Sequence, residues 1–241
     1  MAGKFLGIGG DSAKAFEVII QGGALLAVLG LYHGRIREMW EGMVQGNIQG
    51  RRLALNLLIG FLPAAIAGLL LHHVIKENLF TTSAVASALV MGGVIMIAVD
   101  RWNHHRLNPL GRERSLSAMS FWEAFLIGLA QLFALWPGTS RSMVTLVAGL
   151  LLGFPPAVAA EYSFLLALPT LGAAAGFDLL KNGASLFHDI TFFSFFVGFF
   201  TAAFVSVITI PTFISYLSRG RLAPFGWYRI LLAFLIWKYH V

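Results

Sequence analysis

The residues best suited to chemistry lie in a polar break between two apolar segments. The break covers residues 136–142, Trp-Pro-Gly-Thr-Ser-Arg-Ser, and the apolar segments cover residues 121–135 and 143–154. Arg141 presents a planar fork of donors suited to phosphate, Ser140 and Ser142 add hydroxyls, and Gly138 lets backbone N–H groups come close to a ligand. This pattern predicts a phosphate-binding loop. The alternative is an ordinary helix–helix turn whose arginine reaches back to water.

The composition indicates a polytopic membrane protein. Of the 241 residues, 58% are hydrophobic and 12% are charged, whereas soluble domains are about half apolar and a quarter charged. The net charge of +6 therefore indicates cytoplasmic loops facing anionic lipid, and no nucleic-acid partner. Both segments beside the polar break are shorter than the roughly 20 residues of a membrane crossing. An arginine at membrane depth is costly and usually has a functional partner.

Hydropathy predicts an all-α fold in a single transmembrane domain, residues 1–241. The predicted spans are residues 16–32, 53–72, 84–99, 157–177, 191–214 and 225–239, with the 121–154 hairpin among them. Loops 33–52, 100–120 and 215–224 hold ten arginines, whereas loops 73–83 and 178–190 hold one lysine each. The positive-inside rule places the arginine-rich loops in the cytoplasm. The hairpin then starts and ends there, as a re-entrant loop or two short spanning helices, with its tip in the membrane or toward the outside.

A few other polar residues interrupt the apolar segments. Glu17 and Gln21 lie four residues apart on one helix face, and Glu161 lies near the start of a later span. These side chains either join Arg141 in one central pocket or lie at helix ends near the interface. Thr145 either adds a hydroxyl to the pocket or bonds back to its own helix. The spans of Glu17 and Glu161 run in opposite directions, which is typical of an inverted repeat.

Several motifs together resemble one known family, the undecaprenyl-diphosphate phosphatases of the bacitracin-resistance type. They are Ala-Lys-Ala-Phe-Glu-Val-Ile-Ile-Gln at residues 13–21, Gly-Phe-Leu-Pro-Ala at 60–64, Ala-Leu-Trp-Pro-Gly-Thr-Ser-Arg-Ser at 134–142, Ala-Ala-Glu-Tyr-Ser-Phe-Leu-Leu-Ala at 159–167, Pro224-Phe225 and Tyr228-Arg229. The resemblance implies hydrolysis of a polyprenyl diphosphate to its monophosphate at the outer side of the bacterial cytoplasmic membrane. This reaction recycles the lipid carrier for cell-wall synthesis. The resemblance also implies an inverted repeat with two re-entrant hairpins, a divalent cation (Mg²⁺ or Ca²⁺) and contact with membrane lipids. The oligomeric state stays open between a monomer and a homodimer.

On this resemblance Arg141 and Ser140 are the predicted catalytic residues. Arg141 clamps the diphosphate, and Gly138, Thr139, Ser142 and Thr145 bind substrate beside it. Glu17, Gln21 and Glu161 form the possible wider pocket. No residue of this sequence is predicted to bind the metal. Met143 stands where the family usually has glycine or another small residue, which crowds the tip of the loop.

The family's first signature, with two glutamates four apart and a Ser-Ser-Thr-Gly-His-like run, is absent from this sequence. Its metal ligands and nucleophile therefore map onto no residue here. We expect the sequence to begin at an internal methionine, downstream of a first hairpin. The alternative is a shortened, inactive relative. A transporter or flippase of the lipid monophosphate and a non-catalytic scaffold are the rival functions.

Overall fold

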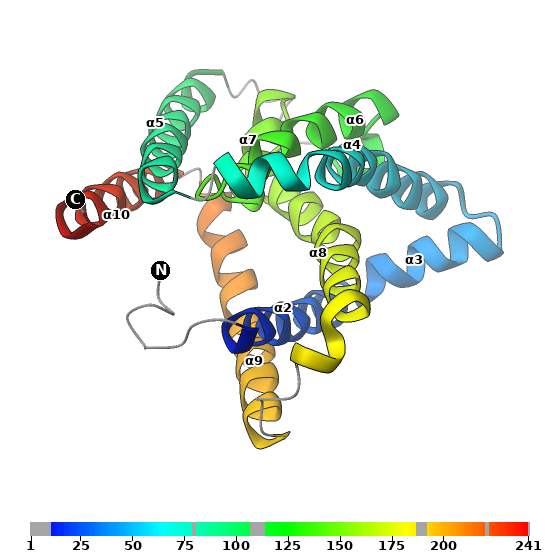
Figure 1. Ribbon diagram of the computed structural model, residues 1–241. Coiled ribbons are helices and arrows are strands. Elements are labelled where there is room, and N and C mark those ends of the chain that lie inside the picture. Colours follow the sequence, from blue (N-terminus) through cyan, green and yellow to red (C-terminus); the bar gives the residue numbers. More distant parts are fainter. Residues whose placement is uncertain (1–10, 79–80, 107–113, 187–191, 220–221, 241) are drawn as a thin grey trace. The chain divides into compact units, whose positions relative to one another are not determined.

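The computed structural model describes residues 11–78, 81–106, 114–186, 192–219 and 222–240, and within these ranges all regular structure is helical (Figure 1). The elements are α2 (Asp11–Leu31), α3 (His33–Val44), α4 (Ile48–Asn78), α5 (Thr82–Arg106), η2 (Leu116–Ala118), α6 (Phe121–Ala130), η3 (Gln131–Leu135), α7 (Arg141–Leu151), α8 (Pro156–Leu186), α9 (Phe192–Ser218) and α10 (Ala223–His240). The all-α fold predicted from the sequence is confirmed.

Among the residues that the structure describes, four helices are long and apolar enough to cross a membrane, and they include residues 48–70, 82–102, 156–177 and 192–218. Within the same residues, α2 and α3, which meet at 75°, add a fifth crossing if they form one broken span. The predicted span at 225–239 corresponds to α10, which is not among the four. Arg229 and Lys238 interrupt its apolar sequence, which lowers the hydropathy of the helix.

The predicted loop at 33–52 is largely helical, and this corrects the sequence prediction. Most of it forms α3 and the first turn of α4. Gly42 lies against the backbone of Gly50 and Arg51, and Gly50 lies against the backbone of Glu38. Side chains at these glycines would collide with the facing backbone. The two helices can therefore pack closely. The charges of this segment predicted a loop, but Arg, Glu and Met are also good helix formers, so a charged stretch can be helical.

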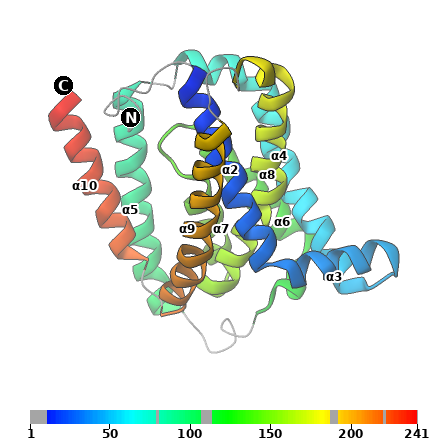
Figure 2. The same ribbon diagram turned by 90° about the horizontal axis from the view of Figure 1, so that it is seen from below.

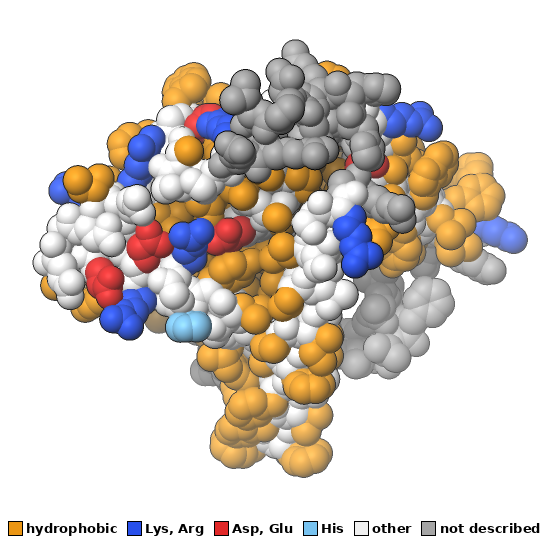
Figure 3. Space-filling model, turned by 180° about the vertical axis from the view of Figure 1, so that it is seen from behind, with side chains coloured by type: hydrophobic (Ala, Val, Ile, Leu, Met, Phe, Trp, Pro, Cys, Tyr) orange, Lys and Arg blue, Asp and Glu red, His pale blue; other side chains and the backbone are white. Residues whose placement is uncertain are grey.

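The chain divides into two compact units, and the first comprises residues 1–37 and 167–212. In this unit α2 packs on α9, where Gly23 contacts the backbone of Phe199. The phenylalanines of α9 stack at helical spacing, with Phe195 5.9 Å from Phe199 and Phe196 5.8 Å from Phe200 between ring centroids. Hydrophobic side chains gather in the centre and lower part of the face drawn in Figure 3. Only 11% of the most apolar part of α9 is buried within the protein. This exposure suits contact with lipid.

The second unit comprises residues 38–166 and 213–241 and contains the whole 121–154 hairpin. In this unit α5 packs along α10, α4 packs along α6, and α7 contacts both α5 and α6 (Figure 2). A Cβ added to Gly128 of α6 would lie 2.5 Å from the carbonyl oxygen of Gly60, so only glycine fits there. Gln131 donates to the same carbonyl at 2.8 Å. The prediction of one domain over residues 1–241 stays a prediction.

Candidate active site

The tip of the hairpin is a tight turn that leads directly into α7. Pro137 and Gly138 occupy its centre, the Thr139 N–H donates to the Trp136 carbonyl at 3.1 Å, and Gly138 has φ +94°. This is the arrangement of a type II turn, which favours proline followed by glycine. Ser140 then has φ +69° and ψ 109°, and it is the one non-glycine residue with positive φ in the described ranges. Strain of this kind clusters at functional sites.

The first turn of α7 is open to an anion. Ser140 precedes the helix, but its side chain makes no capping hydrogen bond. The first intrahelical bond runs from the Val144 N–H to the Ser140 carbonyl. The N–H groups of Arg141, Ser142 and Met143 therefore have no partner within the helix. A helix start of this kind attracts phosphate through its free donors and its dipole.

The side chains of the tip differ in how accessible they are. Ser140 is exposed, and its Oγ lies 3.3 Å from that of Ser142. Thr139 is only 6% exposed, and its hydroxyl is buried without a hydrogen-bond partner among the described residues. Leaving a buried hydroxyl unpaired costs about 1–3 kcal/mol. The tip thus combines exposed hydroxyls with one buried hydroxyl that has capacity for a hydrogen bond.

Arg141 is oriented by α8. Its Nη1 donates to the Ser163 carbonyl at 3.0 Å, and its other guanidinium donors make no hydrogen bond within the described part of the chain. Thr145, which is 1% exposed, lies beneath it. The Thr145 hydroxyl lies 2.6 Å from the Ser163 hydroxyl and 3.1 Å from the Arg141 carbonyl. Thr145 therefore joins α7 to α8 and bonds back to its own helix, and direct contact of its hydroxyl with a ligand stays a prediction.

The tip is also held from the opposite side by α5 and α10. The Trp136 indole N–H donates to the Ala84 carbonyl at 3.1 Å. A Cβ on Gly138 would lie 2.8 Å from the Val85 carbonyl oxygen, so the turn packs tightly on α5. Arg229 of α10 donates to the carbonyls of Gly138 and Thr139 at 2.7 and 2.9 Å. The conformation of the turn therefore depends on helices distant in sequence.

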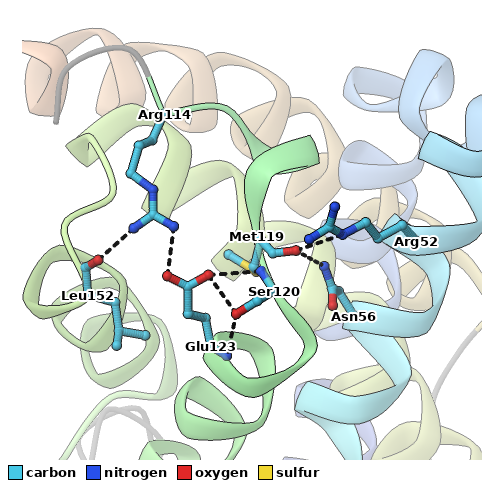
Figure 4. A network of polar contacts seen from close by, with 7 residues as sticks. All are labelled: Arg52, Asn56, Arg114, Met119, Ser120, Glu123 and Leu152. Carbon is cyan, nitrogen blue, oxygen red and sulfur yellow. Dashed lines mark hydrogen bonds and ion pairs between the residues drawn. The ribbon is translucent and has the colours of Figure 1, made fainter. Parts of the chain in front are cut away.

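The base of the hairpin is tied by a separate polar network (Figure 4). Ser120 and Glu123 form a capping box at the start of α6. Arg114 donates to Glu123 at 2.7 Å and to the Leu152 carbonyl at the end of α7 at 2.8 Å. Its guanidinium also lies 4.0 Å above the Phe154 ring. One arginine thus connects both ends of the hairpin.

Two further residues fix the approach to this base from α4. Arg52 and Asn56 donate to the Met119 carbonyl at 3.1 and 3.0 Å. Asn56 is fully buried, and its own backbone carbonyl accepts a hydrogen bond from the Tyr162 hydroxyl at 2.8 Å. The connection before α6 is therefore anchored to α4, which in turn is anchored to α8.

Glu123 lies outside the four long apolar helices, at the first turn of α6. Burial tends to raise the pKa of its carboxyl. The Ser120 N–H and hydroxyl and the Arg114 guanidinium oppose this effect and hold the pKa below its ordinary value of 4.5. Glu123 is thus ionised at neutral pH and serves as a structural anion.

The structure gathers six of the predicted site residues into one turn and the following helix, namely Gly138, Thr139, Ser140, Arg141, Ser142 and Thr145. Glu161 lies on α8 in the same unit, two residues before Ser163. Gln21 and Glu17 lie on α2 in the other unit, and the side chain of Glu17 is outside the described part. A pocket that includes all three with Arg141 stays a prediction.

The metal implied by the resemblance finds no matching residues in the described ranges. Within them, no group of three or more His, Asp or Glu side chains is placed to hold a metal ion. The donors at the tip are N–H groups, a guanidinium and hydroxyls, which suit an anion. We therefore assign no catalytic step of this chain to a metal.

Several contributors to the site were not predicted from the sequence. Arg229 could have been found by the reasoning that selected Arg141, because it is also a charged residue within an apolar segment. The spacing of Ser120 and Glu123 is a readable signal for a helix that starts at residue 121. The Trp136 hydrogen bond left no signal in the sequence, since it depends on which helix lies beside the turn.

Comparison with known proteins places this chain in a family. The bacitracin resistance protein BacA family matches residues 1–235. A Sorangium cellulosum protein named undecaprenyl-diphosphatase is 45% identical over 98% of this chain and 76% of its own length. Proteins of the same name from Campylobacter fetus and Methylobacillus flagellatus are 41% and 37% identical, and the matches cover 98% and 100% of this chain and 88% of each relative. The chain therefore belongs to the BacA family.

Proposed function

We propose that this protein hydrolyses undecaprenyl diphosphate to undecaprenyl phosphate and inorganic phosphate, and so recycles the lipid carrier for cell-wall synthesis. The observation that carries the proposal is the identity of 37–45% to undecaprenyl-diphosphatases over nearly the whole chain. The tip of the hairpin supports it, because a strained turn, an uncapped helix start and an arginine converge there. The free N–H groups of the helix start and the guanidinium of the arginine are the donors that a diphosphate needs.

In the proposed reaction a water oxygen bonds to the terminal phosphorus while the bond from that phosphorus to the bridging oxygen breaks. The bridging oxygen leaves as part of the polyprenyl monophosphate, and the proton that the attacking water loses passes to a phosphate oxygen of the products or to solvent. Arg141 and the first N–H groups of α7 stabilise the negative charge that develops on the phosphate oxygens, and preorganised donors of this kind lower the barrier. Ser140 and Ser142 orient the terminal phosphate. The Ser163 carbonyl holds the Arg141 guanidinium, and Thr145 holds Ser163 beneath it.

The second unit also offers an apolar surface for a prenyl chain. A groove of about 530 Å³ lies between α4 and the α6–η3 segment, and its lining is almost wholly apolar: Ile59, Leu62, Pro63, Ile66, Ala67, Leu70, Phe125, Leu129 and Leu132. The last of these residues lies on η3, which leads directly to the tip. We infer that part of the prenyl tail occupies this groove.

The remaining parts of the proposal come from the family resemblance. They place the protein in the bacterial cytoplasmic membrane with the tip facing the extracytoplasmic side, and they include a need for Mg²⁺ or Ca²⁺. The homodimer stays a prediction, and measurement of the mass of the native protein tests it. Chelation by EDTA, followed by addition of either cation, tests the metal requirement for turnover.

Phosphate release from undecaprenyl diphosphate by the purified full-length protein in detergent is the direct test. A phosphatase releases phosphate without a sealed compartment, whereas a transporter or flippase does not. We expect release by the wild type and by Arg219→Ala, a control at an exposed arginine. Absence of release from the folded wild type, together with transport of the monophosphate in vesicles, would support the rival function.

A further inference from the structure

Arg229 is a charged residue within an apolar helix, and it has no role in the reaction proposed above. It lies on α10 and is only 9% exposed. A charged side chain at membrane depth is costly, so its partners usually explain its presence. Its partners are the carbonyls of Gly138 and Thr139, both accepting from Nη2 at 2.7 and 2.9 Å. Both belong to the turn that carries the candidate site.

Two contacts between α5 and α10 place this guanidinium. Asp100 on α5 accepts from the N–H groups of Leu222 and Ala223 at 2.9 and 3.1 Å, which fixes the start of α10. One turn further, Gly93 and Gly226 face each other so closely that a Cβ on either would lie 2.6 Å from the carbonyl oxygen of the other. The two helices are therefore locked in register before α10 reaches Arg229.

Gly92 provides the space in which the guanidinium lies. A Cβ at this position would come within 2.8 Å of Arg229 Nη2 and 2.8 Å of Met143 Cε. Met143 is buried at 6% exposure, so it fills the space beneath the turn beside the guanidinium. The larger residue at 143 is thus accommodated by the missing side chain at Gly92.

The two carbonyls determine where the neighbouring N–H groups point. The described ranges contain no cis peptide bond, and the C=O and N–H of a trans peptide point in opposite directions. Because the Thr139 carbonyl points at Arg229, the Ser140 N–H points away from α10. The positive φ at Ser140, a non-glycine residue, strains this stretch, and such conformations persist only where surrounding contacts hold them.

We propose that Arg229 is a positioning residue, whose guanidinium holds the Gly138 and Thr139 carbonyls so that the Ser140 N–H and the first donors of α7 face the phosphate of the substrate. The inference rests on the proposed function, since it specifies how the phosphate-binding turn is kept in its active conformation. Arg229 acts through the turn and is not assigned a contact with substrate.

The first test compares Arg229→Met and Arg229→Lys with Arg219→Met as a control at an exposed arginine. We expect Arg229→Met to lower kcat about 10–100-fold, because a displacement of catalytic donors by about 1 Å can cost a factor of 100. Arg229→Lys keeps a donor and should recover part of the loss. The loss in kcat should be equal for a long and a short prenyl diphosphate, since the turn acts on phosphate and not on the tail.

A glycine substitution tests the same geometry without removing the arginine. Gly92→Ala should displace the guanidinium and the Met143 methyl, which are both ends of flexible side chains, so the helix can still fold. We expect a smaller loss of kcat than in Arg229→Met, and no additional loss when Gly92→Ala is combined with Arg229→Met. Gly172→Ala is the matched control, because no atom lies within 4 Å of the added Cβ.

Titration calorimetry with inorganic pyrophosphate makes the test independent of turnover, and thermal unfolding in detergent confirms that each variant is folded. We expect Arg229→Met to weaken pyrophosphate binding about tenfold, the effect of a loss of about 1.4 kcal/mol. Folded Arg229→Met with kcat and pyrophosphate affinity within twofold of wild type would overturn the positioning role. If Arg229→Met does not fold, Gly92→Ala and Arg229→Lys decide, and wild-type behaviour of both would overturn it. A wild type that binds pyrophosphate more tightly than Arg229→Met but releases no phosphate would contradict the proposed function and retain the positioning role of Arg229.

Discussion

The two ends of the 121–154 hairpin are built on opposite principles. At the base, Ser120 and Glu123 satisfy each other in a capping box, and Arg114 connects Glu123 to the end of α7. At the tip, the helix start has no cap, Ser140 has positive φ, and the Thr139 hydroxyl is buried without a partner in the described ranges. Both ends lie in one unit, and helices α6 and α7 join them.

This difference separates stability from function within a single hairpin. A capped helix and a bridging arginine lower the free energy of the folded state without leaving groups free for a ligand. An uncapped helix start and a strained turn do the reverse, and their cost is recovered when an anion binds. Changes at the base should therefore affect folding, and changes at the tip should affect turnover.

The largest expected effect comes from the tip. Arg141→Ala removes the guanidinium proposed to stabilise the transition state, and we expect kcat to fall by about 100–1,000-fold, as for loss of one preorganised donor. Thermal unfolding should change little, because the one described hydrogen bond of the guanidinium is to the Ser163 carbonyl. Near-normal phosphate release by Arg141→Ala would contradict the clamp role.

The base should respond in the opposite way. Arg114→Met removes the ion pair with Glu123, the bond to the Leu152 carbonyl and the contact with the Phe154 ring. We expect the free energy of unfolding to fall by about 2 kcal/mol, and kcat per folded molecule to stay within twofold. Arg219→Met serves as the control, since this arginine is exposed. A large drop in kcat with unchanged stability would show that base and tip are not separable.

Thr139 allows a substitution at the tip that should stabilise the protein. Thr139→Val keeps the shape of the side chain and removes a buried hydroxyl without a described partner, so we expect stability to rise by about 1 kcal/mol. Pyrophosphate binding, measured by calorimetry, should weaken severalfold if the hydroxyl serves the ligand. Lower stability would indicate a partner in the folded state, and unchanged binding would remove Thr139 from the substrate-binding residues.

The smallest effect concerns the pH dependence of the base. The folded-state pKa of Glu123 lies below its ordinary value of 4.5, so its ionised form stabilises the fold above that pH. This contribution should be lost as pH falls below about 4.5 through the folded-state pKa. Because Glu123 and Arg114 are partly exposed, solvent screening keeps the effect small. Thermal unfolding curves of wild type and Glu123→Gln should run parallel above about pH 5 and converge as the pH falls below about 4.5 through the folded-state pKa; curves that stay parallel down to about pH 2 would contradict this assignment.

The sequence was sufficient to predict the long helices and the tip of the hairpin. Apolar length located the long helices, and the break at 136–142 located the tip, because both signals reside in consecutive residues. The helix α3 was not predicted from its arginines, although Arg, Glu and Met in the same stretch are good helix formers. Arginine-rich sequence alone indicated a loop there.

The supports of the candidate site could not be predicted, because they depend on which helices become neighbours. Arg229 was recognisable as a costly charge, yet its target at Gly138 lies 91 residues away in sequence. Arg114 similarly reaches Leu152 across 38 residues. No local pattern encodes such pairs. The polar residues that would bind a ligand are thus readable from the sequence, whereas those that orient them require the structure.

The central claim is that the tip, and not the base, binds the diphosphate group. Calorimetric titration of inorganic pyrophosphate into the wild type, Arg141→Ala and Arg114→Met, each verified as folded by thermal unfolding, tests it most directly. We predict that the wild type and Arg114→Met bind with affinities within twofold of each other and that Arg141→Ala shows no measurable binding. Equal binding by all three proteins, or loss of binding in Arg114→Met alone, would contradict the account.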